Sequence, residues 1–154
     1  MADKNVFLPP RPVMRAVWSL HRGIYRISRG RLGLKRPQPG REGALRLTTT
    51  GRRSGQPRSV IVAYFEDGPD QVTLAMNGWG AGEPAWWLNL LAEPDATTEV
   101  DGRERPVRAR AATPGAEHDR LWQRWRDLDP KLDAYAARRP TPTTVVILEP
   151  RQRG

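Results

Sequence analysis

The sequence predicts a mainly β protein: a small, closed antiparallel barrel with helices inserted between its strands. Two observations support this fold class. Six short segments carry alternating or β-branched apolar residues, and most of them are separated by turn sequences that suit hairpins. The length of 154 residues suits a single core. Closure of the sheet would remove the exposed edges that such short strands otherwise leave.

The chain begins with a proline-containing lead-in at residues 1–12, followed by a predicted amphipathic helix at 13–34. One face of this helix is apolar, with Val13, Val17, Leu20, Ile24 and Ile27. The opposite face is basic, with Arg15, Arg22, Arg26 and Arg29. The segment RPQPG at 36–40 reads as a linker. We therefore divide the chain into an N-terminal part, 1–40, and a barrel domain, 41–154.

The first three strands are expected at 44–50, 58–66 and 71–76, because these segments are apolar and are separated by the turn sequences GRRSGQP and DGPD. A glycine-rich loop at 77–83 then leads into a helix that starts at Pro84. On this helix Trp87, Leu90 and Leu91 make the expected buried stripe.

The second half of the chain continues the pattern. Two strands at 96–100 and 103–112 flank Asp101-Gly102, which is a strong two-residue hairpin signal. A helix is expected at 115–128, with its apolar side chains on one side, and the last strand at 143–149.

Composition excludes several kinds of site. There is no cysteine, so disulfides, thiolate catalysis and cysteine-ligated metals are impossible. The two histidines, His21 and His118, are too few for a histidine-rich metal site, and we predict no metal. No apolar run of about 18 residues suggests a membrane span, and no signal-peptide pattern is seen at the N-terminus. We therefore expect a cytoplasmic protein.

The net charge of +9 is concentrated in the first part of the chain. Residues 1–60 hold 14 Lys and Arg against 2 Asp and Glu, whereas residues 61–154 hold 12 against 15. This positive charge predicts an anionic partner: a phosphorylated cofactor, an anionic membrane surface or a nucleic acid. The strands lack the aromatic ladder on which bases stack, so we expect no nucleic acid.

A basic turn, TTTGRRSGQPR at 48–58, is the first candidate site. Its glycines allow a tight turn whose backbone amides can bind an anion. Arg52, Arg53 and Arg58 add guanidinium donors that suit phosphate or carboxylate oxygens. A solvated hairpin turn explains the same residues equally well, and the spacing of a Walker loop is missing.

The second candidate site is the loop and helix NGWGAGEPAWWLNL at 77–90. Free backbone amides at the start of a helix suit an anion or a polar ring. Trp86 or Trp87 could pack against a planar heterocycle, although at least one of them is expected in the core. Asn89 needs hydrogen-bond partners if it is buried.

The N-terminal helix has two interpretations. It packs on the barrel with a solvated arginine face, or it lies in a membrane interface, for which Trp18 and Tyr25 at its flank are typical. The first interpretation is favoured, and the second keeps a peripheral membrane contact through residues 13–34 open.

The two candidate sites together resemble the deazaflavin-dependent nitroreductase family of actinobacteria. TTTGRRSGQPR, a hairpin, and a glycine-rich loop running into EPAWWLNLLAEPD carry the resemblance, which covers residues 40 to 150. It implies a split β-barrel of the FMN-binding type that uses coenzyme F420. It further implies hydride transfer from the reduced deazaflavin to a hydrophobic acceptor such as a quinone, nitroaromatic or enone. The alternative is a non-catalytic barrel that binds a lipid or FMN. With either function, we expect a monomer or a homodimer.

The resemblance also implies site residues. The turn and Arg58 would hold the phosphate and oligoglutamate tail of the cofactor, while the strand at 60–64 and the loop at 76–87 would border its ring. The candidate cofactor-binding residues are Thr49, Arg52, Arg53, Ser54, Gly55, Gln56, Pro57, Arg58, Val62, Met76, Asn77, Gly78, Trp79, Ala85, Trp86 and Asn89. The candidate substrate contacts are Tyr64, Trp18 and Tyr135.

Overall fold

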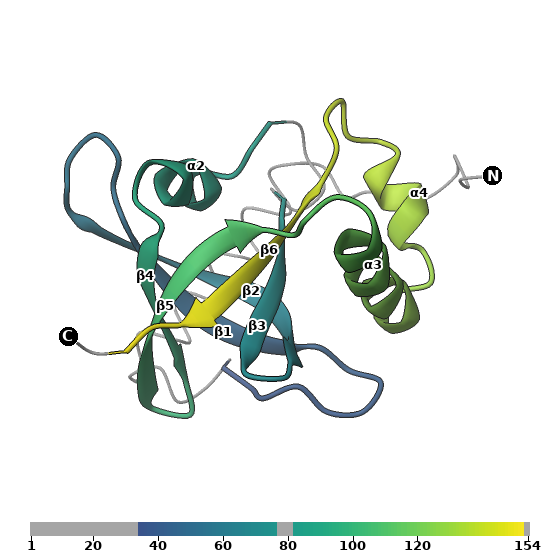
Figure 1. Ribbon diagram of the computed structural model, residues 1–154, viewed down its shortest axis with the longest axis horizontal. Coiled ribbons are helices and arrows are strands. Elements are labelled where there is room, and N and C mark those ends of the chain that lie inside the picture. Colours follow the sequence, from purple (N-terminus) through teal and green to yellow (C-terminus); the bar gives the residue numbers. More distant parts are fainter. Residues whose placement is uncertain (1–33, 77–81, 153–154) are drawn as a thin grey trace, which may run out of the picture.

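The computed structural model describes residues 34–76 and 82–152 (Figure 1). Their strands are β1 (Gly43–Thr50), β2 (Pro57–Asp67), β3 (Asp70–Ala75), β4 (Asp95–Val100), β5 (Arg103–Ala111) and β6 (Thr144–Pro150). Their helices are α2 (Ala85–Ala92), α3 (Ala116–Leu128) and α4 (Leu132–Ala136). Every predicted strand is present, within one or two residues at most ends. The predicted helix at 13–34 lies outside the described residues except for Leu34, which is buried and in no helix.

The six strands close into an antiparallel barrel in the order β1-β2-β3-β6-β5-β4. Chain neighbours pair as hairpins at β1–β2, β2–β3 and β4–β5. The β4–β5 turn is Asp101-Gly102, with φ of 53° and 74°, as a tight two-residue hairpin requires. Long-range pairing of β3 with β6 and of β1 with β4 completes the barrel. The predicted closed barrel is therefore confirmed.

Alternation along the strands produces two cores. Side chains on one face of each strand fill the barrel, as Val62 and Tyr64 of β2 do together with Leu45 and Leu47 of β1. Side chains on the other face, such as Phe65, pack beneath α3 and α4 in a second cluster. Because neighbouring side chains in a strand point to opposite faces, Tyr64 and Phe65 belong to different cores.

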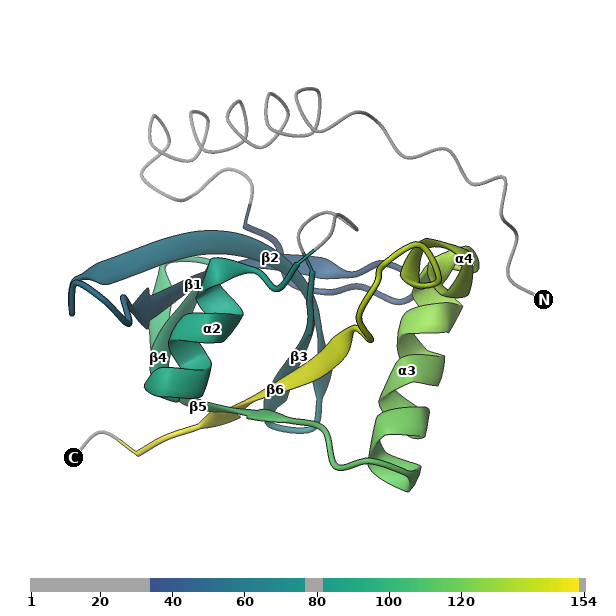
Figure 2. The ribbon, with the colours of Figure 1, turned by 90° about the horizontal axis from the view of Figure 1, so that it is seen from above.

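The helices lie at opposite ends of the molecule: α2 packs against the core inside the barrel, whereas α3 and α4 pack on the outer face of its strands (Figures 1 and 2). On α2 the buried residues are Trp86, Trp87, Asn89 and Leu90, whereas Leu91 is 62% exposed. The predicted stripe was thus wrong at Leu91, because the helix turns Trp86 and Asn89 toward the barrel instead. The short helix α4 was not predicted, since five residues carry too little periodicity to be recognised.

The segment before β1 is hydrogen-bonded to the start of β1. Lys35 and Ala44 exchange backbone hydrogen bonds of 3.0 and 2.9 Å, and Gln38 and Arg41 close a turn between them. The predicted linker at 36–40 is therefore in contact with β1 through its flanking residues. That residues 1–40 form a separate part of the chain stays a prediction.

None of the helices in the described part of the chain has the length and apolar character that crossing a bilayer requires.

Candidate functional site

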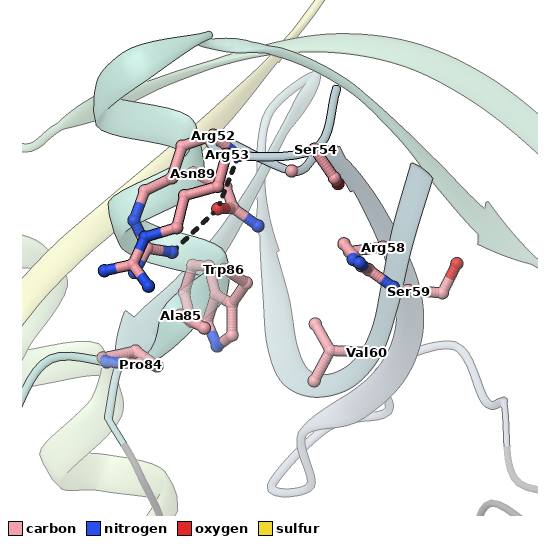
Figure 3. A pocket seen from close by; sticks show the side chains of 11 residues that line it. Arg52, Arg53, Ser54, Arg58, Ser59, Val60, Pro84, Ala85, Trp86 and Asn89 are labelled. Carbon is pink, nitrogen blue, oxygen red and sulfur yellow. Dashed lines mark hydrogen bonds between the residues drawn. The ribbon is translucent and has the colours of Figure 1, made fainter. Parts of the chain in front are cut away.

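A pocket of about 440 Å³ lies at the α2 end of the barrel (Figure 3). Three parts of the chain line it: the turn between β1 and β2, the first residues of β2, and the start of α2. Its lining residues are Gly51, Arg52, Arg53, Ser54, Arg58, Ser59, Val60, Pro84, Ala85, Trp86 and Asn89. The two candidate sites of the sequence thus meet in one pocket, although the lining residues Arg58 and Pro84 are 26 positions apart in the chain.

The turn between β1 and β2 is held by its own backbone. Gly51 donates its N–H to the carbonyl of Gln56 at 2.8 Å, and Gly55 donates to the carbonyl of Gly51 at 2.8 Å. A Cβ on Gly51 would lie 2.7 Å from Ser54 Oγ and 3.1 Å from the carbonyl oxygen of Gln56, so a larger residue would displace the serine hydroxyl that accepts from the Gln56 N–H. Gly55 has a φ of +70°, which favours glycine. These requirements explain the GRRSG sequence and keep Arg52, Arg53 and Ser54 at the pocket.

Asn89 joins α2 to this turn. Its side-chain oxygen accepts from the backbone N–H of Arg52 at 3.2 Å and from Arg52 Nη1 at 3.0 Å. Its side-chain nitrogen donates to Thr49 Oγ1 at 3.1 Å. Asn89 and Thr49 are only 4% and 2% exposed, so these hydrogen bonds are largely shielded from water. The expectation that a buried Asn89 needs partners is met, and its partners place the Arg52 side chain at the pocket.

The charge of the pocket is uniformly positive. Arg52, Arg53 and Arg58 line it, and none of the described lining residues is acidic. In the described part of the chain, none of these three arginines forms an ion pair with a carboxylate. Figure 3 shows Arg52 and Arg53 extending over α2, with Arg58 on β2 across the pocket. Such a group of guanidinium donors suits an anion with several oxygens.

Apolar surface complements the arginines. Trp86 is 7% exposed and belongs to the barrel core, yet it also lines the pocket. Val60 of β2 and Ala85 of α2 line the same pocket (Figure 3). The pocket therefore offers a basic part for an anion and an apolar part for a ring, which are the two kinds of surface that a phosphorylated, ring-bearing cofactor needs.

The structure brings seven of the candidate cofactor-binding residues together. The lining includes Arg52, Arg53, Ser54, Arg58, Ala85, Trp86 and Asn89. Four others lie next to the pocket without lining it. Thr49 stands behind Asn89, while Gly55, Gln56 and Pro57 shape the exposed tip of the turn and the start of β2.

Other candidates are placed elsewhere. Val62 points into the barrel, and Met76 packs against the cluster beneath α3. Of the candidate substrate contacts, Tyr135 is on α4, and neither it nor Tyr64 lines the pocket. Asn77, Gly78, Trp79 and Trp18 lie outside the described residues.

Tyr64 is a core residue of the barrel, because its side chain is only 1% exposed and packs among apolar neighbours. Burial, with a smaller contribution from the nearby Glu66 carboxylate, raises the pKa of Tyr64 to about 12. Its hydroxyl is therefore protonated at neutral pH. The alternation of β2 places it inside the barrel, whereas a pocket contact requires a position at the end of the strand.

Four lining residues were missing from the candidates: Gly51, Ser59, Val60 and Pro84. Gly51 and Pro84 were part of the two motifs, so the motifs themselves carried that signal. Ser59 and Val60 follow Arg58 directly in β2 and border the pocket because the strand begins at its edge.

Comparison with known proteins assigns a family to this arrangement. The model of the family described as F420H(2)-dependent quinone reductase matches residues 18–150. The chain is similar to the F420H(2)-dependent quinone reductase of Mycobacterium tuberculosis strain H37Rv, with 34% identity over 131 residues that cover 84% of this chain and 87% of that protein.

Solved structures share the fold. One described as an F420-H2 dependent reductase superposes with a TM-score of 0.61 and 25% identity, covering 69% of this chain and 93% of that chain. Another, described as a domain-swapped dimer, has a TM-score of 0.65 and 24% identity, covering 90% and 99%, and shows the fold alone. The predicted split barrel and the predicted deazaflavin-dependent activity are confirmed. This chain belongs to the F420H2-dependent quinone reductase family, whose cofactor is coenzyme F420.

Proposed function

We propose that the pocket between the β1–β2 turn and α2 holds F420H2 for the reduction of a quinone. Arg52, Arg53 and Arg58 would bind the phosphate and the oligoglutamate tail of the cofactor. Trp86 and Val60 would border the deazaflavin ring. This assignment of residues extends the family membership to particular side chains of this chain.

One observation carries the proposal: three guanidinium groups converge on a pocket that has no carboxylate among its described lining residues. The three arginines are exposed to solvent and, among the described residues, none is paired with a carboxylate, so their guanidinium donors remain accessible to an anionic ligand. The Asn89 hydrogen bonds hold the Arg52 side chain in place before any ligand arrives, and backbone hydrogen bonds fix the turn that carries Arg53, which lowers the entropic cost of binding.

The residues fit the chemistry that the cofactor supplies. When bound, F420H2 provides the hydride, and the quinone becomes a hydroquinone once it also gains a proton. The chain then needs only to bind the two molecules, to orient them and to exclude water. The apolar lining from Trp86, Val60 and Ala85 suits that task. We extend the range of acceptors to nitroaromatics and enones, which also accept hydride at an electron-poor centre.

Titration of the protein with coenzyme F420 and with FMN tests the assignment, and turnover of F420H2 with a soluble quinone tests the activity. We expect tight F420 binding, quinone-dependent loss of F420H2 and weaker FMN binding. Tighter binding of FMN, or fatty-acid binding without F420 turnover, would instead favour the non-catalytic barrel.

We also propose a peripheral membrane contact through residues 13–34. The support is the sequence pattern alone: an apolar stripe opposite Arg15, Arg22, Arg26 and Arg29. Each arginine near an anionic surface adds on the order of 1 kcal/mol, and a lipid-soluble quinone would be at hand there.

Co-sedimentation with anionic and neutral vesicles tests this contact. We expect salt-reversible binding to anionic vesicles that is lost when these four arginines are replaced by glutamine. Equal sedimentation of the wild type and the variant would instead favour the interpretation that the segment packs on the barrel.

A further inference from the structure

Arg139 is the most deeply buried charged side chain among the ion pairs of the described residues, with 0% exposure of its side chain. It lies between α4 and β6, and it is used by none of the steps above. Its Nη1 donates to the carbonyl of Ala75 at 3.1 Å and to Thr143 Oγ1 at 2.8 Å. Its Nη2 donates to the carbonyl of Gly82 at 2.9 Å. One guanidinium therefore joins three parts of the chain.

Glu83 forms an ion pair with this buried charge. Its Oε1 lies 3.7 Å from Arg139 Nη2, and its side chain is 28% exposed. Its other oxygen, Oε2, is buried and has no hydrogen-bond partner among the described residues. Burial of an arginine costs free energy that only well-placed acceptors and a counter-ion offset. Glu83 supplies such a counter-ion, at 3.7 Å from Nη2.

The positions of these partners matter for the pocket. Ala75 is the last residue of β3, and Gly82 and Glu83 come directly before Pro84, the N-cap of α2. The carbonyl of Pro84 accepts from the N–H groups of Trp87 and Leu88 at 3.0 and 3.2 Å, so it starts the helix. Pro84 itself lines the pocket, as do the next two residues.

The N-terminus of α2 has little support of its own. The helix has eight residues, no side-chain cap and no acidic residue in its first turn. Its other polar anchor is Asn89, near the C-terminal end, which binds the basic turn. The described hydrogen bonds therefore fix α2 by Asn89 at one end and by the Arg139 contacts at the other.

We propose that Arg139, with Glu83 as its counter-ion, is a positioning residue for the cofactor pocket: it fixes the start of α2 against the end of β3. This inference rests on the proposed function of the pocket. A residue that only held the fold together would affect stability everywhere, whereas this contact should affect α2 and cofactor binding first.

The test compares Arg139→Met with Arg138→Met, a matched control that removes the same charge from the exposed neighbour. Glu83→Gln is a milder second variant, because it keeps the side-chain shape and an acceptor but removes the counter-charge. Arg139→Lys asks whether a charge alone rescues, since an ammonium lacks the planar fork that reaches several acceptors at once. Amide hydrogen exchange is measured on each cofactor-free protein, and the Kd for F420 and the kcat with a soluble quinone on each loaded one.

In Arg139→Met we expect exchange at 82–92 to rise about tenfold with little change in β1, and the Kd for F420 to rise about tenfold at nearly constant kcat. Glu83→Gln should shift both by about threefold, Arg139→Lys should recover them in part, and Arg138→Met should match the wild type. Unchanged exchange at 82–92 would overturn the proposal. So would faster exchange throughout the barrel with an unchanged Kd in the folded fraction, which would make Arg139 a structural residue only.

Failure of the proposed function has a different signature. If the wild type itself does not bind F420, the assignment of the pocket falls, and with it the effect of Arg139 on a cofactor. The exchange data on the cofactor-free proteins still decide whether Arg139 fixes α2.

Discussion

Two regions of this molecule are rich in arginine, but among the described residues only one of them pairs its arginines with carboxylates. At the α2 end, Arg52, Arg53 and Arg58 line a pocket without a carboxylate partner among the described residues. At the α3 end, each arginine that faces the barrel or α4 has one. Arg120 binds Asp67 through both oxygens at 2.8 and 2.9 Å, and Arg124 reaches the same carboxylate at 3.2 Å.

The other α3 contacts follow the same rule. Arg110 binds Glu117 at 2.7 and 2.9 Å and Glu149 at 3.1 Å, and Arg126 binds Asp133 at 2.7 Å. Hydrogen bonds from Arg120, and to a smaller extent its positive charge, hold the pKa of Asp67 below its usual range. The comparison teaches that arginine content alone does not identify a binding site. What distinguishes the pocket is the absence of described acids around its arginines.

The largest expected effect comes from removing the pocket charge. Replacing Arg52, Arg53 and Arg58 with alanine should weaken F420 binding by about tenfold per essential contact, and by about a hundredfold or more together. The matched control replaces Arg120, Arg124 and Arg126 with alanine and should leave affinity within about twofold, because those charges are already neutralised. Binding titrations distinguish the two sets. Similar losses in both would mean that net charge, and not the pocket, attracts the cofactor.

A smaller change should follow when one negative charge is added to the pocket. Asn89→Asp keeps the oxygen that accepts from Arg52, and the Thr49 hydroxyl can turn to donate to the new carboxylate. We therefore expect little change in the free energy of unfolding but about a tenfold rise in the Kd for F420, since the pocket gains an acid. Urea unfolding and titration measure the two separately. Unchanged affinity would show that Asn89 and Arg52 are remote from the bound anion.

Added salt should weaken the binding of F420 a few-fold more than the binding of FMN. The tail of F420 carries several carboxylates, whereas FMN carries a single phosphate. Raising the salt from about 0.05 to about 0.5 M should weaken F420 binding about threefold more than FMN binding, because added ions screen exposed charges. Titrations at four salt concentrations give both slopes. Parallel slopes would show that the basic turn does not bind the tail.

The smallest effect is expected at the neutralised end. Hydrogen bonds from Arg110, with one from the Thr113 backbone, lower the pKa of Glu117 from 4.5 to about 2. A carboxyl whose folded-state pKa is depressed stabilises the fold above its unfolded pKa, and this contribution is lost as the pH falls from about 4.5 through about 2.

Glu117→Gln should therefore flatten the acid side of the stability curve by less than about 1 kcal/mol, since the pair is partly exposed. The measurement is urea unfolding of the wild type and the variant between about pH 6 and pH 2. F420 affinity at neutral pH should not change. An equal acid loss in both proteins would assign the pH dependence to other carboxyls, such as Asp67.

Much of the fold could be predicted because its signals are local. Strand alternation, the Asp101-Gly102 hairpin and the breaks at glycine and proline are visible within a few residues. The basic turn could be recognised for the same reason, since Gly51, Gly55 and the arginines between and after them are contiguous. The local pattern failed where it was short, at α4, and where it was ambiguous, at Leu91.

The sequence by itself thus determined six strands, a basic turn and a tryptophan-rich helix. Only the tertiary structure decided that the turn and the helix share a pocket, because Asn89 meets Thr49 and Arg52 across 40 and 37 residues of chain. Closure of the barrel likewise decided that Tyr64 is inside and Phe65 outside, since alternation separates two faces without saying which one becomes the interior. The neutralisation of the α3 arginines and the burial of Arg139 follow the same logic. The sequence contains the charged residues, but their partners depend on which distant segments the fold brings within hydrogen-bonding distance.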